Sequence, residues 1–379
     1  MDFSLSEEHH IVRETARTFA QTELLPGVVE RDEHQTFPKE QIKKLGELGF
    51  LGMMVDPKYG GSGMDTISYV IALEEIAKVD ASTAVIMSVN NSLVCWSLEK
   101  YGTEEQKQKY LLPLASGQKL GAFALSEPEA GSDATQQHTT AIDMGDHYLL
   151  NGTKNWITNG GSSDIVVIIA QTHPELAHKG INAFIVEKNS PGFTVGPKEN
   201  KMGIRSSDTH QLLFNDVRIP KSNLIPPDKN GFKFAMETLN GGRIGIAAQA
   251  LGIAAGAYEL SLKYSKERKT FGKPISQHQA IQFKLAEMAT QIDAARLLCY
   301  KAAFQKDAGL DYSTSSATAK LFASKTAMDV TVEAIQIHGG YGYVKEFHVE
   351  RLMRDAKITQ IYEGTSEIQK MVISRALLK

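Results

Sequence analysis

Hydrophobic residues change their spacing twice along the 379-residue chain, which divides it into three parts. In residues 1–118 they recur every three or four positions, as in LSEEHHIVRETARTFAQTELLP, whose serine is suited to cap a helix. In residues 119–226 short β-rich runs such as DIVVIIAQT, INAFIVEK and HQLLFNDVRI are separated by Gly, Pro, Asn and Asp. Helical spacing returns in residues 227–379. We therefore expect an α+β, mainly helical protein with an N-terminal helical domain, a middle β domain and a C-terminal helical bundle.

The C-terminal part contains a long apolar seam. In HQAIQFKLAEMATQIDAARLLCYKAAF the apolar positions step by four and three, at Ile281, Leu285, Met288, Ile292, Ala295 and Cys299. Such spacing is typical of a helical bundle or a coiled coil. A seam of this length, with further apolar helices around it, predicts an oligomer.

Composition argues against several classes of protein. Apolar residues make up 42% of the chain, which suffices for a full core, and the net charge of −3 gives no basic patch for nucleic acid. Cys95 and Cys299 are the only cysteines and neither lies in a CxxC motif, so we expect reduced cysteines rather than disulfides or a zinc site. We find no signal or transit pattern and no run of about 18 apolar residues, so we expect a cytoplasmic protein without a membrane span.

Several common enzyme motifs are absent. No GxGxxG follows a strand, no GxxxxGK[ST] or HExxH occurs, and GGSGM misses the GxSxG spacing by one residue. These absences argue against a simple Rossmann dehydrogenase, a P-loop enzyme, a zinc enzyme and a serine hydrolase. We therefore expect no metal.

One carboxylate stands out near the C-terminus, in TQIYEGTSEIQ (residues 359–369). Glu363 lies just before Ser366-Glu367-Ile368-Gln369, which fits a capping box, so we expect it in the turn before a helix. A carboxylate there either complements the helix dipole or acts as a base. This stretch alone leaves both interpretations open.

Two segments in the β-rich part carry candidate binding chemistry. FALSEPEAGSDAT (residues 123–135) is either a loop whose backbone N–H groups hold an anion or a ring edge, or an ordinary turn. In NGTKNWITNGG (residues 151–161), Asn-Gly predicts a tight turn before a strand. That strand presents Trp156 either to a flat ligand or to the core.

Two segments in the C-terminal part also carry candidate binding chemistry. SKERKTFGKPISQHQAIQF (residues 265–283) places Arg268 beside a Phe-Gly break, either to grip a pyrophosphate or as part of a solvated basic turn. AIQIHGGYGYVKEF (residues 334–347) ends a helix in a glycine-rich loop. Such glycines let a backbone approach a ligand closely, or simply stop the helix.

Together, and in this order, these segments resemble the acyl-CoA dehydrogenase family of flavoproteins. The resemblance covers nearly the whole chain, through MSVNNSL, ALSEPEAGSD, NGTKNWITN, KMGIRSS, GRIGIAAQALGIA, ERKTFGKP, QIHGGYGY and YEGTSEIQ, and it is closest to short-chain (butyryl-CoA) dehydrogenases. It implies a middle β-barrel-like domain, a C-terminal four-helix bundle and a homotetramer. It also implies non-covalent FAD at a subunit interface, an acyl-CoA substrate and electron-transfer flavoprotein as the acceptor.

The resemblance also implies a reaction. Glu363 matches the catalytic base, which removes the α-proton of butyryl-CoA while the β-hydrogen leaves as hydride to flavin N5, giving trans-2-enoyl-CoA. Other branches carry the base at the position of Gly242, which cannot serve here. Residues that match FAD contacts are Phe123, Leu125, Ser126, Gly131, Ser132, Trp156, Ile157, Thr158, Arg268, Phe271, Gln279, Gln336, Gly339, Gly340, Thr365 and Glu367. Arg268, Gln279, Gln336, Gly339 and Gly340 would come from the neighbouring subunit. Residues that match contacts to the CoA ester are Ser132, Asn240, Arg243 and Gly364.

The acyl chain length and the electron acceptor stay open at this stage. Val89 and Leu93 are candidate floor residues of the acyl pocket, and Trp96 either shortens that pocket or fills the core. The alternatives are an acyl-CoA oxidase, a medium- or branched-chain acyl-CoA dehydrogenase and, from another class, a non-catalytic acyl-CoA-binding helical protein.

Overall fold

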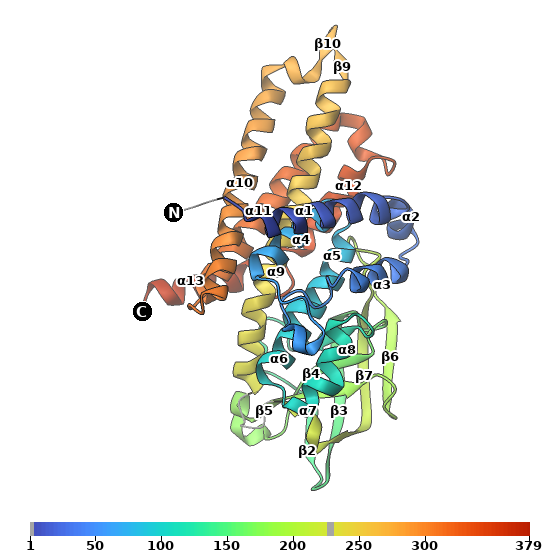
Figure 1. Ribbon diagram of the computed structural model, residues 1–379, viewed down its shortest axis with the longest axis vertical. Helices are drawn as coiled ribbons and strands as arrows, with labels where there is room; N and C mark the ends of the chain where they lie inside the picture. Colours follow the sequence, from blue (N-terminus) through green and yellow to red (C-terminus); the bar gives the residue numbers. More distant parts are fainter. Residues whose placement is uncertain (1–3, 226–230) are drawn as a thin grey trace.

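The computed structural model describes residues 4–225 and 231–379. Helices occupy the N-terminal third, strands follow up to Ile225, and helices return from Gly231 (Figure 1). The predicted fold class, a mainly helical protein with a middle sheet domain, is confirmed. The predicted boundary at residues 226/227 lies outside the described residues, and the domain limits stay a prediction.

The N-terminal region is built from short helices around a buried helical run. Ser6 caps the first helix in a capping box with His9, which takes the place of a glutamate. Two buried helical stretches follow, α4 and the continuous run from Ala81 to Tyr101, which contains a π-helical turn, Val89–Cys95. The elements are α1 (Glu7–Phe19), a π-turn (Ala20–Leu24), α2 (Val28–Glu33), α3 (Lys39–Glu47), α4 (Thr66–Ala77), α5 (Ala81–Ser88), α6 (Trp96–Tyr101), α7 (Glu104–Gln106), a π-turn (Lys107–Leu111) and α8 (Leu112–Ala115).

The middle region is one eight-stranded sheet. Its order is β6-β7-β3-β2-β4-β5-β8, and β1 pairs with β4 in parallel. The strands are β1 (Gly121–Ala124), β2 (Thr140–Asp143), β3 (His147–Thr158), β4 (Ile165–Gln171), β5 (Ile181–Glu187), β6 (Phe193–Lys198), β7 (Thr209–Pro220) and β8 (Leu224–Ile225).

The prediction of a tight turn at Asn151-Gly152 is wrong. Both residues lie inside β3, where the pairing with β7 shifts register between Leu150 and Gly152. Gly152 has φ +143°, and a Cβ there would lie 2.6 Å from the Cα of Thr139. Glycine is therefore needed for a bulge and a close approach of two strands, rather than for a hairpin turn.

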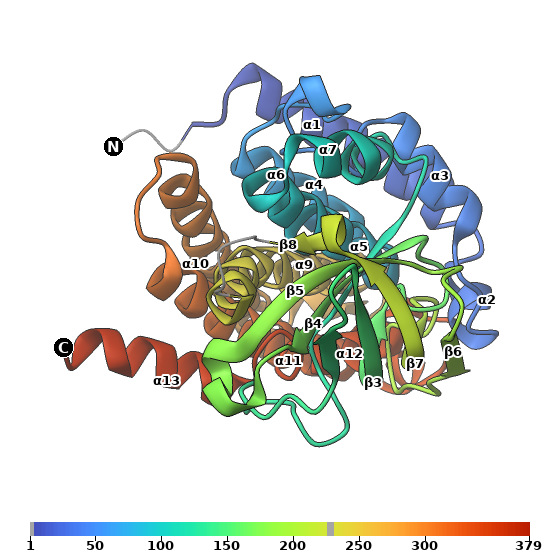
Figure 2. The same cartoon turned by 90° about the horizontal axis from the view of Figure 1, so that it is seen from below.

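Long helices form the C-terminal region around a central helix, α9 (Figure 2). Helix α9 packs against α4, α5, α10 and α11. The predicted seam on α10 is confirmed from its second position on, since Leu285, Met288, Ile292, Ala295 and Cys299 are buried, whereas Ile281 is half-buried. The elements are α9 (Gly231–Glu267), β9 (Lys269–Thr270), β10 (Lys273–Pro274), α10 (Gln279–Asp307), α11 (Ser313–His338), α12 (His348–Ile358) and α13 (Ser366–Leu377). Both cysteines are free and buried.

Helix α9 also bears on the expectation that no segment spans a membrane. Within residues 4–225 and 231–379, it is the one helix long and apolar enough to do so, with a mean hydropathy of 1.2 in its most apolar window. However, 83% of that window is buried inside the protein. The apolar character of α9 is therefore accounted for by its central place in the core.

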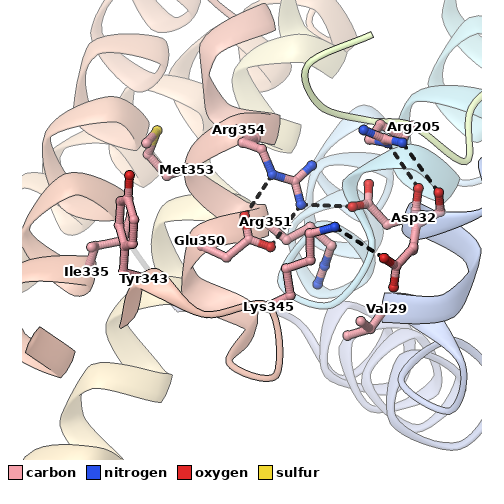
Figure 3. Close-up of a pocket in the computed structure, with 11 residues that line it drawn as sticks. Val29, Asp32, Arg205, Ile335, Tyr343, Lys345, Glu350, Arg351, Met353 and Arg354 are labelled. Carbon is pink, nitrogen blue, oxygen red and sulfur yellow. Dashed lines mark hydrogen bonds and ion pairs between the residues drawn. The ribbon is translucent and has the colours of Figure 1, made fainter. Parts of the chain in front are cut away.

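Charged residues join the three regions at one cavity of about 360 Å³ (Figure 3). Arg354 of α12 pairs with Asp32 of α2 at 2.8 Å and with Glu350 at 2.7 Å, and Lys345 pairs with Glu33 at 3.2 Å. Arg205, from the loop before β7, donates to the backbone oxygen of Asp32 at 3.1 Å. Since these carboxylates are paired to cations of the chain itself, we assign this cavity to the contact between regions.

Candidate active site

Glu363 lies in the turn between α12 and α13, as predicted, but the capping box proposed after it is wrong. The N-cap is Thr365, one residue earlier, whose hydroxyl accepts from the backbone N–H of Ile368. The side chain of Gln369 does not serve that box; it turns back and donates to the backbone oxygen of Gly364 at 2.9 Å. Glu363 and Gly364 both have left-handed φ angles, +51° and +93°. A left-handed glutamate costs about 1–3 kcal/mol, so the surrounding contacts must hold this turn.

The carboxylate of Glu363 points inward and is under strong electrostatic influence. The residue as a whole is half-buried, but its Oε2 is enclosed and finds no hydrogen-bond partner among the described residues. Burial raises the pKa of Glu363 to about 7, against the opposing effect of two cations, Lys320 on α11 and Arg243 on α9. Arg243 is itself buried and donates to Asn240 at 2.6 Å. Such a carboxyl group can exchange a proton near neutral pH, which a helix-dipole carboxylate in solvent does not do.

Gly242 of α9 makes the space that this carboxylate occupies. A Cβ at Gly242 would come closer than 3.0 Å to Glu363 Oε2, and would lie 2.7 Å from Cδ2 of Leu93. The glycine that excludes a base on α9 therefore also lets Glu363 reach α9. Leu93, a predicted floor residue, lies at this point; Val89, the other one, lies one helical turn earlier in the same π-turn.

The two predicted ring-binding segments lie side by side. The buried ammonium of Lys154 donates to the backbone oxygen of Leu125 at 3.0 Å and to Glu127 at 2.7 Å. The backbone N–H of Asn155 donates to the backbone oxygen of Ser126 at 2.8 Å. Strand β3 thus fixes the loop that starts at Leu125, while Phe123 of the predicted loop lies in β1. Trp156 is 61% exposed with φ +60°, so it is presented outward and is not a core residue.

The remaining residues of these two segments differ in exposure. Gly131 and Ser132 are exposed, Leu125, Ser126 and Thr158 are half-buried, and Phe123 and Ile157 are buried. Two further predicted contacts, Thr365 and Glu367, lie at the start of α13.

A second group of predicted cofactor residues lies at the other end of the long axis, near β9 and β10 (Figure 1). Arg268, Gly339 and Gly340 line a cavity of about 760 Å³, and the Arg268 guanidinium lies 5.5 Å from the ring centre of Tyr341. Phe271, at the tip of the β9–β10 hairpin, is 96% exposed. Gln279 and Gln336 are exposed on α10 and α11. The two groups of predicted cofactor residues are therefore apart within one chain. This separation is consistent with a site that a neighbouring subunit completes.

Three residues of the site escaped sequence reasoning: Lys154, Lys320 and Gln369. A signal for Lys320 was available, because it interrupts a buried face of α11 formed by Ser316, Ala323, Ala327 and Ala334. A lysine on an apolar helical stripe needs a charge partner. The partner, Glu363, lies in another element, which spacing along α11 does not reveal.

Trp96 lies in an aromatic cluster. Its ring packs edge-on against Tyr101 at 6.2 Å, and Tyr101 in turn contacts Phe234 of α9 at 5.2 Å. Lys100 lies 4.9 Å from the Trp96 ring centre. These contacts favour the interpretation of Trp96 as a packing residue.

The residues of both groups fit a flavin dinucleotide. The outward Trp156 offers a flat apolar face, and the exposed Arg268 offers a cation beside a cavity. A Cβ at Gly339 or Gly340 would meet no atom of the described residues within 4 Å, so a ligand has room against that backbone. No group of three or more His, Cys, Asp or Glu suited to a metal occurs in the part of the chain that the structure describes.

The fold and the site together define a flavin-dependent dehydrogenase, and comparison with known proteins gives its family. The N-terminal, middle and C-terminal domain models of acyl-CoA dehydrogenase match residues 6–118, 122–217 and 229–378, and the chain belongs to this family. It is therefore an FAD-dependent oxidoreductase that acts on acyl-CoA esters.

Individual relatives cover the whole chain. The chain is 51% identical to the short-chain specific acyl-CoA dehydrogenase of Clostridium acetobutylicum, over 100% of both chains. The solved butyryl-CoA dehydrogenase of Megasphaera elsdenii is 50% identical, with a TM-score of 0.99 over 100% of both chains. A chain in a structure described as the electron transferring flavoprotein of Acidaminococcus fermentans, with flavin-based electron bifurcation, is 52% identical, with a TM-score of 0.99 over 100% of both chains.

Arg268→Ala should weaken FAD binding by about 10- to 100-fold, because a hydrogen bond to a charged group contributes about 1.5–3 kcal/mol. Equilibrium dialysis of the protein against FAD measures this change. Lys269→Ala is the matched control, since it removes a neighbouring exposed cation of the hairpin. Equal FAD affinity in wild type and Arg268→Ala would remove Arg268 from the cofactor site.

Proposed function

We propose that this protein oxidises a short-chain acyl-CoA, butyryl-CoA, to the trans-2-enoyl-CoA, with Glu363 as the base, and that electron-transfer flavoprotein takes the electrons. The observation that carries the proposal is the buried Glu363 Oε2, which has no hydrogen-bond partner among the described residues. A free, desolvated oxygen with a group pKa of about 7 is suited to accept a proton at neutral pH.

The reaction removes two hydrogens from adjacent carbons. The α C–H bond breaks and its proton goes to Glu363, while the β C–H electron pair leaves as hydride and a C=C bond forms. FAD, when bound, supplies the hydride acceptor. Arg243 and Gly364 lie beside Glu363 and are our candidates, with Ser132 and Asn240, for holding the CoA ester. A backbone N–H or a cation near the thioester oxygen stabilises the negative charge that develops there.

The geometry of the Glu363 turn suits this task. A carboxylate in solvent is too weak a base for a thioester α-proton, whereas burial raises its pKa and strengthens it. The left-handed turn fixes where the oxygen points, and a positioned base is worth about 10²–10⁴ in rate. The alternative, a carboxylate that only complements the dipole of α13, does not require burial or an unpaired oxygen.

The short-chain assignment is supported by the relatives and by the bounded space near Glu363. The three comparison proteins include one named short-chain specific and one named butyryl-CoA dehydrogenase. A Cβ at position 242 would lie 2.7 Å from Cδ2 of Leu93, so Leu93 packs closely against α9 near Glu363. One methylene in an apolar pocket contributes about 1–3 kcal/mol, so activity on neighbouring chain lengths should overlap.

The homotetramer is supported by exposed apolar residues on the C-terminal helices. Helix α13 extends away from the body of the chain (Figure 2), and Leu377 and Leu378 at its end are 76% and 87% exposed. Further exposed side chains are Phe283, Leu297, Phe304, Phe322 and Met371. Such residues suit contacts between subunits, and a neighbouring copy would bring Arg268 to the ring-binding half of the site. The cytoplasmic location stays a prediction.

Electron-transfer flavoprotein is proposed as the acceptor because a chain in the structure of that system is 52% identical to this one. The second candidate function is an acyl-CoA oxidase, which carries out the same removal of two hydrogens but passes the electrons to oxygen. Rapid formation of hydrogen peroxide during aerobic turnover would identify the oxidase.

Glu363→Gln should lower the rate of flavin reduction by butyryl-CoA by about 10²–10⁴, because an amide of equal size cannot take the proton. The protein should still fold and bind FAD and CoA ester. Anaerobic stopped-flow absorbance at the flavin band, with FAD content and ligand binding measured in parallel, gives all three quantities. A near-normal rate in this variant would mean that another group is the base.

Gly242→Ala should lower the same rate by about 10²-fold, because its methyl group would push the carboxylate of Glu363 from its place. Gly241→Ala is the matched control on the same helix, since its Cβ would lie 3.7 Å from the oxygen of Ser92, an ordinary contact. Equal rates for the two variants would contradict the close packing of Glu363 against α9.

A further inference from the structure

Helix α11 buries a lysine against the turn that carries Glu363. Lys320 is 0% exposed, and its ammonium group donates to the backbone oxygen of Gly364 at 2.5 Å. Gln369, also 0% exposed, donates from α13 to the same oxygen at 2.9 Å and to the backbone oxygen of Glu363 at 3.4 Å. Two side chains from different helices thus hold the two carbonyl groups of this turn.

Burying a lysine costs free energy unless its charge is compensated. The backbone oxygen of Gly364 meets one N–H of the ammonium group, but it carries no net charge. Glu363 and Glu367 are the acidic groups that act on Lys320, and Glu367 is exposed on the outer side of α13. Glu363, the carboxylate in the same turn, has the larger effect of the two on Lys320, yet burial still lowers the pKa of Lys320 to about 8.

We propose that Lys320 and Gln369 are positioning residues for Glu363: both hold the left-handed turn through its carbonyl groups, and Lys320 also adds a buried positive charge to that turn. This inference rests on the proposed function, because it takes Glu363 as the base. Neither residue needs to contact the substrate.

The ionisable groups that face Glu363 come from four elements. Arg243 faces it from α9, Lys320 from α11, Tyr362 from the same turn and Tyr69 from α4, while Glu367 of α13 acts on Lys320. Arg243 and Lys320 favour the carboxylate form and so oppose the effect of burial. Loss of the Lys320 charge must therefore raise the pKa of Glu363 further, because the carboxylate form loses a stabilising cation and the protonated form becomes relatively more stable. The two roles separate, since Gln369 holds the same turn without a charge.

The test compares Lys320→Met with Gln369→Met in the FAD-loaded full-length protein. The first readout is the pH dependence of kcat/KM for flavin reduction by butyryl-CoA. At low pH this value falls as the base becomes protonated, and the position of this falling part, the acid limb, reports the pKa of the base in the free enzyme. Lys320→Met should move this limb to higher pH by about one unit or more, lowering the value at pH 7 by about fivefold, with recovery near pH 9. Gln369→Met should lower the rate at every pH and leave the limb in place.

A second readout does not depend on turnover. The infrared band of the protonated Glu363 carboxyl group is the one present in the wild type and missing from Glu363→Gln. Its titration midpoint should lie near pH 7 in the wild type, since the pKa of Glu363 is about 7, and should rise in Lys320→Met. An unchanged midpoint and an unchanged limb in Lys320→Met would overturn the inference.

Lys201→Met is the matched control for loss of a lysine. Lys201 also donates to a backbone oxygen, that of Ser207 at 2.8 Å, and burial lowers its pKa to about 8, as it does for Lys320. Lys201 lies before β7 and is not among the cations that act on the pKa of Glu363, so its variant should leave the limb in place. If Lys320→Met does not fold, Lys320→Arg serves: its charge should keep the limb at the wild-type pH, and a shifted limb would contradict the proposal.

The outcomes separate this inference from the proposed function. A near-normal rate in Glu363→Gln would show that Glu363 is not the base and would overturn the proposed function. An inactive Glu363→Gln together with an unmoved limb in Lys320→Met keeps the base and removes only the role of Lys320.

Discussion

The candidate active site depends on the fit of one buried carboxylate between three helical elements. Glu363 reaches α9 only because position 242 has no side chain, and its turn is held from α11 by Lys320 and from α13 by Gln369. The Oε2 of Glu363 is buried and has no hydrogen-bond partner among the described residues. This burial raises the pKa of Glu363 to about 7, and the cations Lys320 and Arg243 limit that rise. Backbone strain, burial and nearby charges thus all act on Glu363. Such strain and shifted pKa values are concentrated at functional sites in proteins.

The second constraint is that the predicted cofactor residues are divided between the two ends of the chain. The sheet end presents Trp156 on a strand fixed to the loop after Phe123, and the far end presents Arg268 beside an open cavity. A site made of both groups would need a neighbouring copy of the chain. The exposed apolar residues of the C-terminal helices would then serve assembly, and through assembly they would serve cofactor binding.

Local patterns predicted the three-part fold, the α10 seam and the place of Glu363 before a helix, because each follows from nearby residues. The two errors have different causes. Asn151-Gly152 is a bulge because Thr139, from another segment, comes close to Gly152. Thr365 replaces Ser366 as the cap, and Gln369, within the same segment, turns back to Gly364 instead of completing the box. The roles of Lys154 and Lys320 could not be predicted, because their partners lie in different elements. The family resemblance supplied the cofactor and the reaction, which spacing alone left open.

The most direct test of the central claim is anaerobic mixing of the FAD-loaded wild-type protein with butyryl-CoA, and in parallel with octanoyl-CoA, while the visible flavin band is followed. We expect fast bleaching by butyryl-CoA, because Glu363 would take its α-proton. We expect slow bleaching by octanoyl-CoA, because the proposed substrate is a short acyl chain. Bleaching by octanoyl-CoA alone would contradict the short-chain assignment. No bleaching by either ester, with FAD bound, would contradict the proposed reaction itself.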